Sequence, residues 1–353
     1  MRELEMLGLR NEPFAIFEAM GIFGKIDKLQ IIAFQSYGTA SHFYARGRAL
    51  EDNRIDLREK GFFNLLWNTY KRFETDEIRN TPILIKLSDG RTFTGVTDNR
   101  GYYLIDETSQ GLEVLVNTEG WLQYEISYTE ASLKREILHQ NRFPGELLIP
   151  NSAAKFGVIS DIDDTILNTG VVSSLKWRVV INTVFKRAGK RTPLKGAAEF
   201  YHLLHRGTSG DEANPIYYVS HSPWNLYRYL TFFLETNNFP KGPILLRNFP
   251  DPRKPVADPS IPQKQKEIIN ILKTYPELNF ILIGDSGERD PDIYIEIAQN
   301  YPNRIAAIYL RTVMHKKKMQ RVIGMVNAFK TTPILVVEHS DQAIAHAKKM
   351  GFI

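Results

Sequence analysis

An acidic stretch follows an apolar run near the middle of the chain. The run 156–160 leads directly into Asp161-Ile162-Asp163-Asp164-Thr165. Two carboxylates spaced i and i+2 at a strand end can converge where the chain leaves the sheet, so that Asp161 could act as a nucleophile and Asp163 as a proton donor. Such a crowded pair needs a divalent cation or a proton to balance its charge. The same stretch also fits an acidic turn or a helix cap, so by itself it leaves both roles open.

Three further features lie at or beside the ends of later predicted strands. Ser220 follows an apolar run beside Pro223, which is well placed to open a helix and so offer backbone N–H groups to a phosphate. Lys264, in a predicted helix, offers a fixed positive charge. Asp285 and Asp290 follow another run and add carboxylate oxygens, the ligands that Mg²⁺ prefers. Each has an ordinary explanation as a cap, a solvated lysine or a turn, but their joint occurrence predicts a catalytic site for a phosphate.

The second half of the chain alternates apolar runs with segments of helical length. The runs are continuous rather than alternating in polarity, which is typical of strands buried on both faces. Strands that alternate with helices indicate parallel βαβ units, whose active sites lie beyond the carboxyl ends of the strands. The predicted strands are 156–160, 216–219, 243–246, 279–283, 305–310 and 333–337, and the predicted helices are 197–205, 223–236, 263–274, 291–300 and 316–329.

The first half consists of short β-favouring runs after a helical opening. Turn signals such as Ser88-Asp89-Gly90 separate these runs, and regular short strands predict a small antiparallel sandwich. The predicted strands are 29–34, 42–49, 83–87, 91–97, 102–105 and 121–128. Because 353 residues exceed one ordinary domain, we expect two. Residues 1–150 would be a β-rich domain with a helical N-terminal segment, and residues 151–353 would be an α/β domain that carries the candidate catalytic residues.

Composition narrows the class of protein. The chain has 45 Lys and Arg against 40 Asp and Glu, and the positive excess lies in the second half, which suits an anionic partner. It contains no cysteine, which excludes a disulfide scaffold, a thiolate zinc site and a cysteine nucleophile. No apolar stretch reaches the roughly 18 residues of a membrane span, and the N-terminus mixes acidic residues into its apolar positions, unlike a secretion signal. We therefore expect a soluble, cytoplasmic protein.

Longer stretches of the second half resemble a known family. They are similar to the App1-type phosphatidate phosphatase catalytic domain, a relative of lipin and of the LNS2 domain in the haloacid dehalogenase (HAD) superfamily. The stretches are SDIDDTI (160–166), LKWRVVINTVF (175–185), YYVSHSPWNLY (217–227), LIGDSGERDPDIY (282–294) and RIAAIYLRTV (304–313). In the first half, SYGTASHFYARGRALED (36–52) is similar to the β-rich region that precedes this domain in bacterial members. Two residues depart from the family pattern: Gln263 stands where a His usually precedes the motif lysine, and His221 replaces a small residue.

The resemblance implies a fold and a reaction. Residues 151–353 would form a HAD-like Rossmannoid parallel sheet flanked by helices and would hydrolyse phosphatidate to diacylglycerol and phosphate. Asp161 would attack phosphorus to form an aspartyl-phosphate, and Asp163 would protonate the leaving alkoxide and then activate water. Ser220 and Lys264 would hold the phosphoryl oxygens.

The resemblance also implies a cofactor, Mg²⁺. The Asp161 carboxylate, the Asp163 backbone carbonyl and the Asp285 carboxylate would bind the ion. Asp290 would complete the acidic set and support its loop. A phosphate monoester is an anion, so a carboxylate can attack it only where a cation and fixed donors neutralise the developing charge.

A basic segment follows the acidic stretch. Residues 173–195 contain no acidic residue, and aromatic and aliphatic residues recur there at helical spacing. Such a helix could lie on an anionic membrane and face the substrate with Trp177, Lys186, Arg187, Lys190 and Arg191. It would equally fit a helix whose apolar stripe packs on the sheet, and the resemblance favours the lipid interpretation. The second basic cluster, 316–318 with Arg321, would add to membrane attraction or be solvated surface.

Three interpretations remain open from the sequence. The first is a Mg²⁺-dependent phosphatidate phosphatase that acts on a lipid phosphate as a peripheral protein at an anionic membrane surface. The second keeps the chemistry but takes a soluble phosphomonoester. The third is a non-catalytic phosphatidate-binding module, which has no need of two carboxylates facing an anion. Nucleic-acid binding would explain a pI of about 9.1 but not the carboxylates, and the sequence makes no prediction of oligomeric state.

Overall fold

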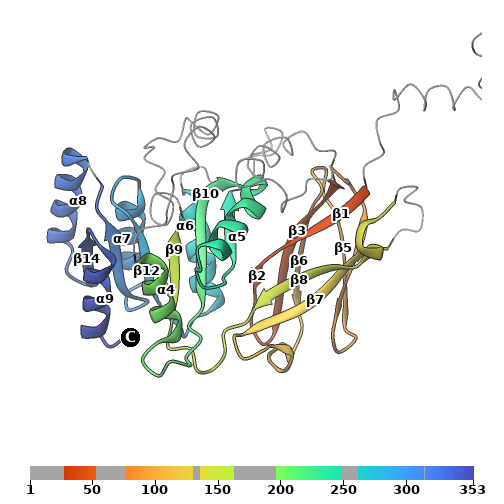
Figure 1. Ribbon diagram of the computed structural model, residues 1–353, viewed down its shortest axis with the longest axis horizontal. Coiled ribbons are helices and arrows are strands. Elements are labelled where there is room, and N and C mark those ends of the chain that lie inside the picture. Colours follow the sequence, from red (N-terminus) through yellow and green to blue (C-terminus); the bar gives the residue numbers. More distant parts are fainter. Residues whose placement is uncertain (1–27, 53–76, 130–135, 163–195, 248–260, 314) are drawn as a thin grey trace, which may run out of the picture.

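The computed structural model describes residues 28–52, 77–129, 136–162, 196–247, 261–313 and 315–353 (Figure 1). The predicted helical opening and the predicted basic helix in 173–195 lie outside the described residues. Within the described residues, no helix combines the length and apolar character that a membrane crossing requires.

The first half is β-rich, as its turn signals and short runs predict. One sheet has the order β1-β3-β6 and the other has the order β2-β8-β7-β4-β5, and apolar residues of both, such as Phe43 and Leu122, form one core between them. All pairs are antiparallel except β2 with β8. The strands are β1 (Lys28–Phe34), β2 (Ser36–Tyr37), β3 (His42–Asp52), β4 (Pro82–Leu87), β5 (Thr92–Val96), β6 (Tyr102–Thr108), β7 (Trp121–Tyr128) and β8 (Phe143–Leu148), with short 3₁₀ helices at Leu112–Leu115 and Leu138–Asn141.

The second half contains a six-stranded sheet in the order β11-β10-β9-β12-β13-β14, in which every pair is parallel. Its strands are β9 (Phe156–Asp161), β10 (Ile216–Pro223), β11 (Ile244–Arg247), β12 (Asn279–Asp285), β13 (Ile305–Arg311) and β14 (Ile334–Val337). Each predicted apolar run coincides with one of these strands. The runs are apolar throughout because helices cover both faces of the sheet.

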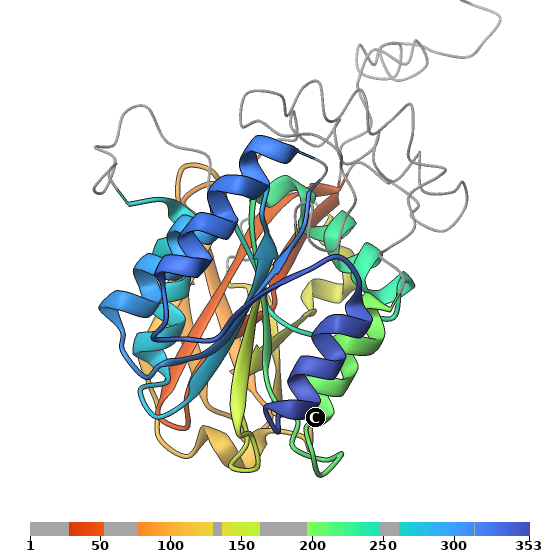
Figure 2. The ribbon, with the colours of Figure 1, turned by 90° about the vertical axis from the view of Figure 1, so that its left-hand side faces the viewer.

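Helices form a layer on each face of this sheet (Figure 2). The helices on one face are α4 (Ala197–Arg206), α5 (Tyr227–Thr236) and α9 (Ser340–Lys349). The helices on the other face are α6 (Gln263–Thr274), α7 (Asp290–Asn300) and α8 (Lys316–Ala328). This α/β architecture confirms the parallel sheet flanked by helices that the sequence predicts.

Pro223 does not open a helix, contrary to the sequence prediction. It is the last residue of β10, it pairs with Arg247 of β11, and a 3₁₀ turn at Trp224–Leu226 separates it from α5. The pairing of β10 with β9 ends earlier, at Val219 opposite Asp161. Beyond that point β10 has one neighbour, so a residue without an N–H group can continue the strand.

Among the elements not predicted from the sequence are the short strand β2, strand β8 and helix α9. Strand β8 has the sequence FPGELL, in which Pro and Gly mask the β signal. Helix α9 is short, and its N-terminal cap is a histidine, His339, with Gln342 completing a capping box in place of the usual Ser, Thr or Asp. Strand β8 and helix α9 are placed by packing, since β8 lies beside β7 and α9 lies against α4 and β14.

The strand order places the two strands with acidic ends side by side. The chain runs from β9 outward to β10 and β11, then crosses the sheet to β12 and continues outward to β13 and β14. Strands β9 and β12 are therefore neighbours whose connections leave in opposite directions. In parallel sheets, ligands bind at such a topological switch point, beyond the carboxyl ends of the strands.

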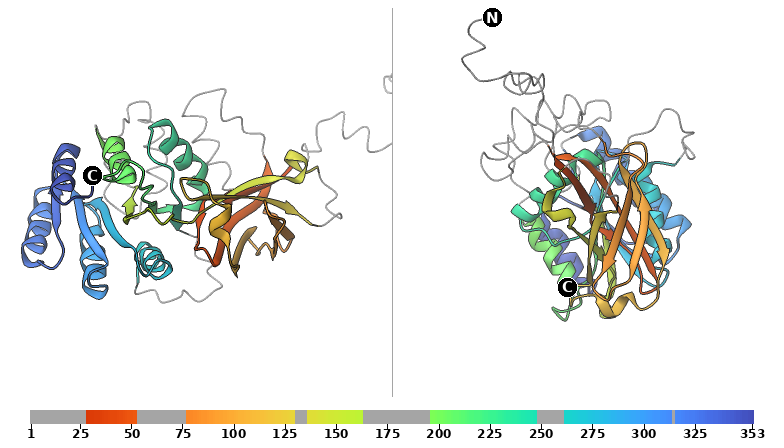
Figure 3. Two further views of the ribbon diagram at one scale, coloured as in Figure 1. Left: turned by 90° about the horizontal axis from the view of Figure 1, so that it is seen from below. Right: turned by 90° about the vertical axis from the view of Figure 1, so that its right-hand side faces the viewer.

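The β-rich half and the α/β half pack directly on one another (Figure 3). Phe34 of β1 stacks on Trp224, with ring centroids 4.3 Å apart. The Tyr275 hydroxyl donates a hydrogen bond to the Gly38 carbonyl at 2.8 Å, and the Gln35 amide donates to the Tyr227 hydroxyl at 2.7 Å. The apolar clusters of the α/β half extend into the first half through these residues.

Replacement of Phe34 by alanine should destabilise the whole protein, because the ring belongs to the core of the other half. We expect the free energy of unfolding in urea to fall by about 3–5 kcal/mol. Leu104→Ala on β6 is the control, since Leu104 is 54% exposed, and its effect should stay within about 0.5 kcal/mol. A loss for Phe34→Ala no larger than that of the control would contradict this account of the interface.

Candidate active site

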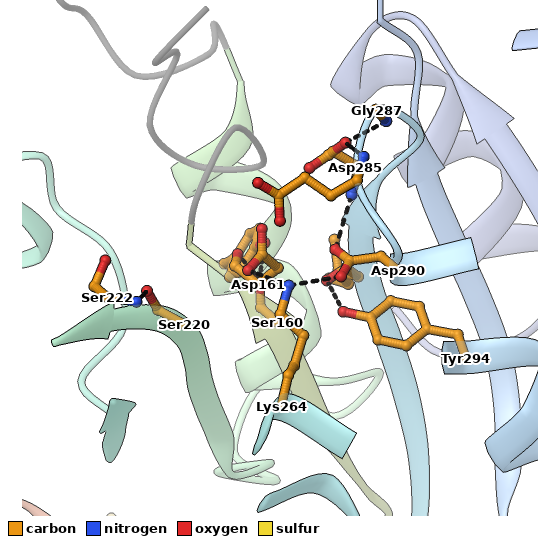
Figure 4. A network of polar contacts seen from close by, with 12 residues as sticks. Ser160, Asp161, Ser220, Ser222, Lys264, Asp285, Gly287, Asp290 and Tyr294 are labelled. Atoms are coloured by element: carbon orange, nitrogen blue, oxygen red, sulfur yellow. Dashed lines mark hydrogen bonds and ion pairs between the residues drawn. The ribbon is translucent and has the colours of Figure 1, made fainter. Parts of the chain in front are cut away.

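Three buried aspartates meet at the switch point. Asp161 is the last residue of β9, Asp285 is the last residue of β12, and Asp290 is the first residue of α7. All three are 0% exposed, and one carboxylate oxygen from each lies within 4.8 Å of the others (Figure 4). The parallel register produces this arrangement, because Ser160 pairs with Ile283 and the two strands end nearly level. Asp161 thus shares one buried site with two carboxylates that lie 124 and 129 positions later in the sequence.

The loop between β12 and α7 is closed by its own aspartates. The Asp285 carboxylate accepts hydrogen bonds from the amides of Gly287 and Glu288, the latter at 2.9 Å. The Asp290 carboxylate in turn accepts from the Asp285 amide at 3.3 Å. Gly284 permits this closure, because a Cβ atom at that position would lie 2.4 Å from Asp290 Oδ2. The GDxxxxD spacing therefore has a steric reason as well as a chemical one.

Lys264 joins the aspartates from the opposite side. Its ammonium donates to Asp161 Oδ1 at 2.7 Å and to Asp290 Oδ1 at 2.6 Å, and all three side chains are fully buried. Burial would lower the pKa of Lys264, but the charges of Asp161 and Asp290 outweigh it and hold that pKa well above its ordinary value. Lys264 is thus a permanent cation that bridges β9 and α7.

Among the described residues, the carboxylates of the site outnumber its ammonium groups. Lys264 contacts Asp161 and Asp290 but Asp285 has no ion pair with it, and a buried charge without a partner is strongly unfavourable. Burial and the charge of Asp290 raise the pKa of Asp285 to about 7. Its Oδ2 atom is buried and has no hydrogen-bond partner among the described residues. This arrangement of hard oxygen donors suits a divalent cation such as Mg²⁺.

Ser220 lies on the neighbouring strand β10, directly after the point where its pairing with β9 ends. It comes one residue after Val219, which pairs with Asp161, and its hydroxyl accepts a hydrogen bond from the Ser222 amide at 2.9 Å (Figure 4). The next residue, His221, is mostly buried, and this burial together with the charge of Lys264 lowers its pKa to about 4. His221, one of the two residues that depart from the family pattern, is therefore neutral at physiological pH.

Residues 156–312, which include these side chains, match the family described as "Phosphatidate phosphatase APP1, catalytic domain". The chain is also 32% identical over 247 residues to Phosphatidate phosphatase APP1 of Saccharomyces cerevisiae. Residues 156–312 are an App1-type catalytic domain.

The alignment with the yeast protein covers 68% of this chain and 39% of the relative. An uncharacterized protein of Schizosaccharomyces pombe is 24% identical over 272 residues, which are 77% of this chain and 41% of that protein. The chain therefore spans less than half the length of both relatives. The crystal structure of Bacteroides thetaiotamicron EndoBT-3987 with Man5GlcNAc product aligns with 86% of this chain and 69% of that chain at 8% identity, and its TM-score of 0.19 is too low to indicate a shared fold.

Several predicted residues of the App1-type domain lie outside the described residues: Asp163, Trp177, Lys186, Arg187, Lys190 and Arg191. Their roles stay predictions. The second basic cluster is described, and half of it has partners within the protein. Lys318 donates to the Gly287 carbonyl at 2.5 Å, and Arg321 pairs with Asp292 at 2.7 Å. Lys316 and Lys317 are exposed.

The structure adds side chains to the App1-type site that the sequence gave no reason to select. The Tyr201 hydroxyl lies 2.5 Å from Ser160 Oγ, directly before Asp161, and the Tyr294 hydroxyl donates to the Ile283 carbonyl at 3.0 Å. Both tyrosines are fully buried core residues in an apolar pattern, so their hydroxyls leave no mark in the sequence. Lys318 was assigned with its basic cluster to a membrane or to solvent, because nothing in its own helix indicates that it reaches the loop after β12.

A cavity of about 210 Å³ lies between the sheet and helices α4 and α9, near the carboxyl ends of β12, β13 and β14. Its walls are mostly apolar and include Phe200, Tyr201 and Val337. Gly284, the neighbour of Asp285, and Arg311 form part of its lining. The backbone next to Asp285 in the App1-type domain thus borders an apolar space, although none of the three aspartates lines it.

Replacement of Lys264 by methionine should strongly destabilise the domain, because it leaves Asp161 and Asp290 buried without their cation. We expect the free energy of unfolding at neutral pH to fall by about 3–5 kcal/mol in urea denaturation. Lys273→Met is the matched control, since Lys273 is exposed on the same helix. Equal stability of the two variants would show that Lys264 does not balance the aspartates.

Proposed function

We propose that this chain is a Mg²⁺-dependent phosphatidate phosphatase that releases phosphate and diacylglycerol through an aspartyl-phosphate. The observation that carries the proposal is the buried set of Asp161, Asp285 and Asp290 around Lys264 at the switch point of an App1-type domain. The printed name of the yeast relative supports the substrate. The order of the acidic, serine and lysine positions along the sheet supports a HAD-like assignment for the domain.

In the proposed reaction, Asp161 is the nucleophile. One of its carboxylate oxygens bonds to phosphorus while the bond from phosphorus to the glycerol oxygen breaks. Asp163 gives its proton to that departing oxygen, and diacylglycerol leaves. Asp163 then takes a proton from water, whose oxygen attacks the phosphorus, so that phosphate leaves and the Asp161 carboxylate is restored.

The charge that develops on the phosphoryl oxygens needs fixed donors. The Lys264 ammonium already contacts Asp161 and keeps its positive charge. It can therefore stabilise the negative charge that develops on the phosphoryl group attached to Asp161. Ser220, one strand away, supplies a hydroxyl on the other side of Asp161. Both side chains are buried on rigid elements, which keeps the donors in place during the reaction.

Asp161, Asp285 and Asp290 are the residues that would hold Mg²⁺, with the backbone carbonyl of Asp163. The unpaired Oδ2 of Asp285 and the excess of carboxylates over ammonium groups support this assignment. When bound, the ion would neutralise the phosphoryl oxygens and one of the buried negative charges.

A lipid substrate is supported by the relative's name and by the apolar cavity that Gly284, the residue before Asp285, helps to line. We propose that Trp177, Lys186, Arg187, Lys190 and Arg191 face an anionic membrane, so that the protein is cytoplasmic and transiently peripheral. We also propose that the chain divides into a β-rich domain, 1–150, and a catalytic domain, 151–353. Hydrolysis of soluble phosphomonoesters alone, or phosphatidate binding without hydrolysis, are the alternative outcomes of the test below.

Asp161→Asn should abolish phosphate release while leaving the fold intact, because an amide cannot act as the nucleophile. We expect a loss of about 10³-fold or more in kcat, measured as phosphate released from phosphatidate vesicles with Mg²⁺ present. Asp292→Asn is the matched control, since Asp292 is 40% exposed and pairs with Arg321. Unchanged turnover in the Asp161 variant would end the aspartyl-phosphate scheme.

The same assay separates the substrates. Wild-type protein is given phosphatidate vesicles and, in parallel, a panel of soluble phosphomonoesters, each with Mg²⁺ and with a chelator. Faster release from vesicles supports the lipid assignment. Release from soluble esters alone would replace it, and vesicle binding without release would favour the binding module.

Asp285→Asn should remove the stabilisation by Mg²⁺. The Asp285 carboxylate has a buried oxygen without a hydrogen-bond partner among the described residues, and this variant replaces that carboxylate by a neutral amide. For the wild type, a Mg²⁺ concentration about 100 times the dissociation constant should add about 2.7 kcal/mol to the free energy of unfolding. Thermal melts with and without MgCl₂ measure this difference, and Asp292→Asn should retain it. A Mg²⁺ response that survives in the Asp285 variant would place the ion elsewhere.

A further inference from the structure

One arginine of the β-rich half contacts two segments of the α/β half. Arg46 lies on β3, and its Nη1 atom is 3.5 Å from Oε1 of Glu267 on α6. Its guanidinium carbon also lies 4.7 Å from the ring centroid of Trp224 and 5.7 Å from that of Tyr44. The side chains of Arg46 and Glu267 are 13% and 7% exposed, so the contact is almost closed to solvent.

Both partners adjoin the candidate active site. Glu267 lies one helical turn after Lys264 on α6, and its carboxylate accepts a hydrogen bond from the Gln263 side chain at 3.1 Å. Trp224 comes directly after β10, the strand that contains Ser220. A single side chain from the first half therefore contacts the helix of the lysine and the segment that follows the serine.

The Arg46 side chain remains positively charged in this position. Burial would lower its pKa, but the carboxylate of Glu267 outweighs burial and raises it above the ordinary value. The aromatic faces of Trp224 and Tyr44 add a favourable contact for a cation. Arg46 therefore keeps its charge at physiological pH.

This contact is a poor source of overall stability. Arg46 Nε and Nη2 and Glu267 Oε2 are buried with no hydrogen-bond partner in the part of the chain that the structure describes. The cost of removing both charges from water offsets their attraction, and an apolar pair would pack there without that cost. The contact does, however, fix the distance and rotation of α6 relative to β3.

We propose that Arg46 is a positioning residue for the active site, and that the β-rich half is thereby a structural part of the catalytic unit. By holding Glu267 and Trp224, Arg46 keeps α6 where Lys264 reaches Asp161 and Asp290 at 2.7 and 2.6 Å. A shift of α6 by about 1 Å would break one of these contacts, and displacements of that size cost about 10²-fold in rate. Only the activity readout of this inference rests on the proposed function.

Arg46→Gln is the principal test, with two independent readouts in the full-length protein. We expect kcat for phosphatidate to fall by about 10- to 100-fold with little change in KM, because substrate contacts remain. We also expect faster hydrogen exchange in residues 263–274, because α6 loses an anchor. Arg142→Gln is the matched control, since it breaks an ion pair with Glu125 on the exposed surface of the same half, and both readouts should stay as in the wild type.

Two further variants separate positioning from a general structural effect. Glu267→Gln removes the other charge but keeps the side-chain shape, and it should reproduce the loss in kcat. The double variant Arg46→Gln with Glu267→Gln should be no worse than either single variant, since both act through one contact. Arg46→Lys should recover part of the activity, because it keeps the charge but not the planar group over Trp224.

Unchanged kcat and unchanged exchange in α6 for Arg46→Gln would overturn the proposal, as would additive losses in the double variant. Should Arg46→Gln fail to fold by circular dichroism, Glu267→Gln decides in its place. Wild-type protein without phosphatase activity would refute the proposed function instead, and hydrogen exchange would still test whether Arg46 anchors α6.

Discussion

The contact of the Lys264 ammonium with Asp161 and Asp290 is the interaction on which the rest of the structure depends. Three carboxylates lie in a fully buried site, and the one ammonium between them keeps like charges from forcing the strand ends apart. The remaining negative charge appears in the raised pKa of Asp285 and in its unpaired oxygen. Among the described residues, negative charge thus exceeds positive charge in this site, and such a site favours the binding of a cation, which in turn can stabilise an anionic group during its transfer.

The architecture serves this contact. The strand order makes β9 and β12 neighbours, the turn after β12 folds Asp290 back toward Asp285, and α6, in the same layer as α7, brings Lys264 to them. Gly284 leaves room for the fold-back, since any side chain there would meet Asp290. Gly284 also helps to line the apolar cavity between the sheet and helices α4 and α9.

The β-rich half takes part in the same system of contacts. Phe34, Tyr275 and Tyr227 join the two halves through rings and hydrogen bonds, and Arg46 reaches the helix that carries Lys264.

The sequence by itself determined the local features of this protein. Continuous apolar runs predicted all six strands of the parallel sheet, because burial on both faces requires apolar residues at every position. The same runs predicted that Asp161, Ser220 and Asp285 lie at strand ends, since each follows its run directly. The tertiary structure decided what depends on contacts between distant segments. It paired Lys264 with Asp290 as well as Asp161, left Asp285 Oδ2 without a partner, made Pro223 a strand residue and joined Arg46 to Glu267. These features depend on distance and burial in three dimensions, and neither quantity is written in the spacing of residues along the chain.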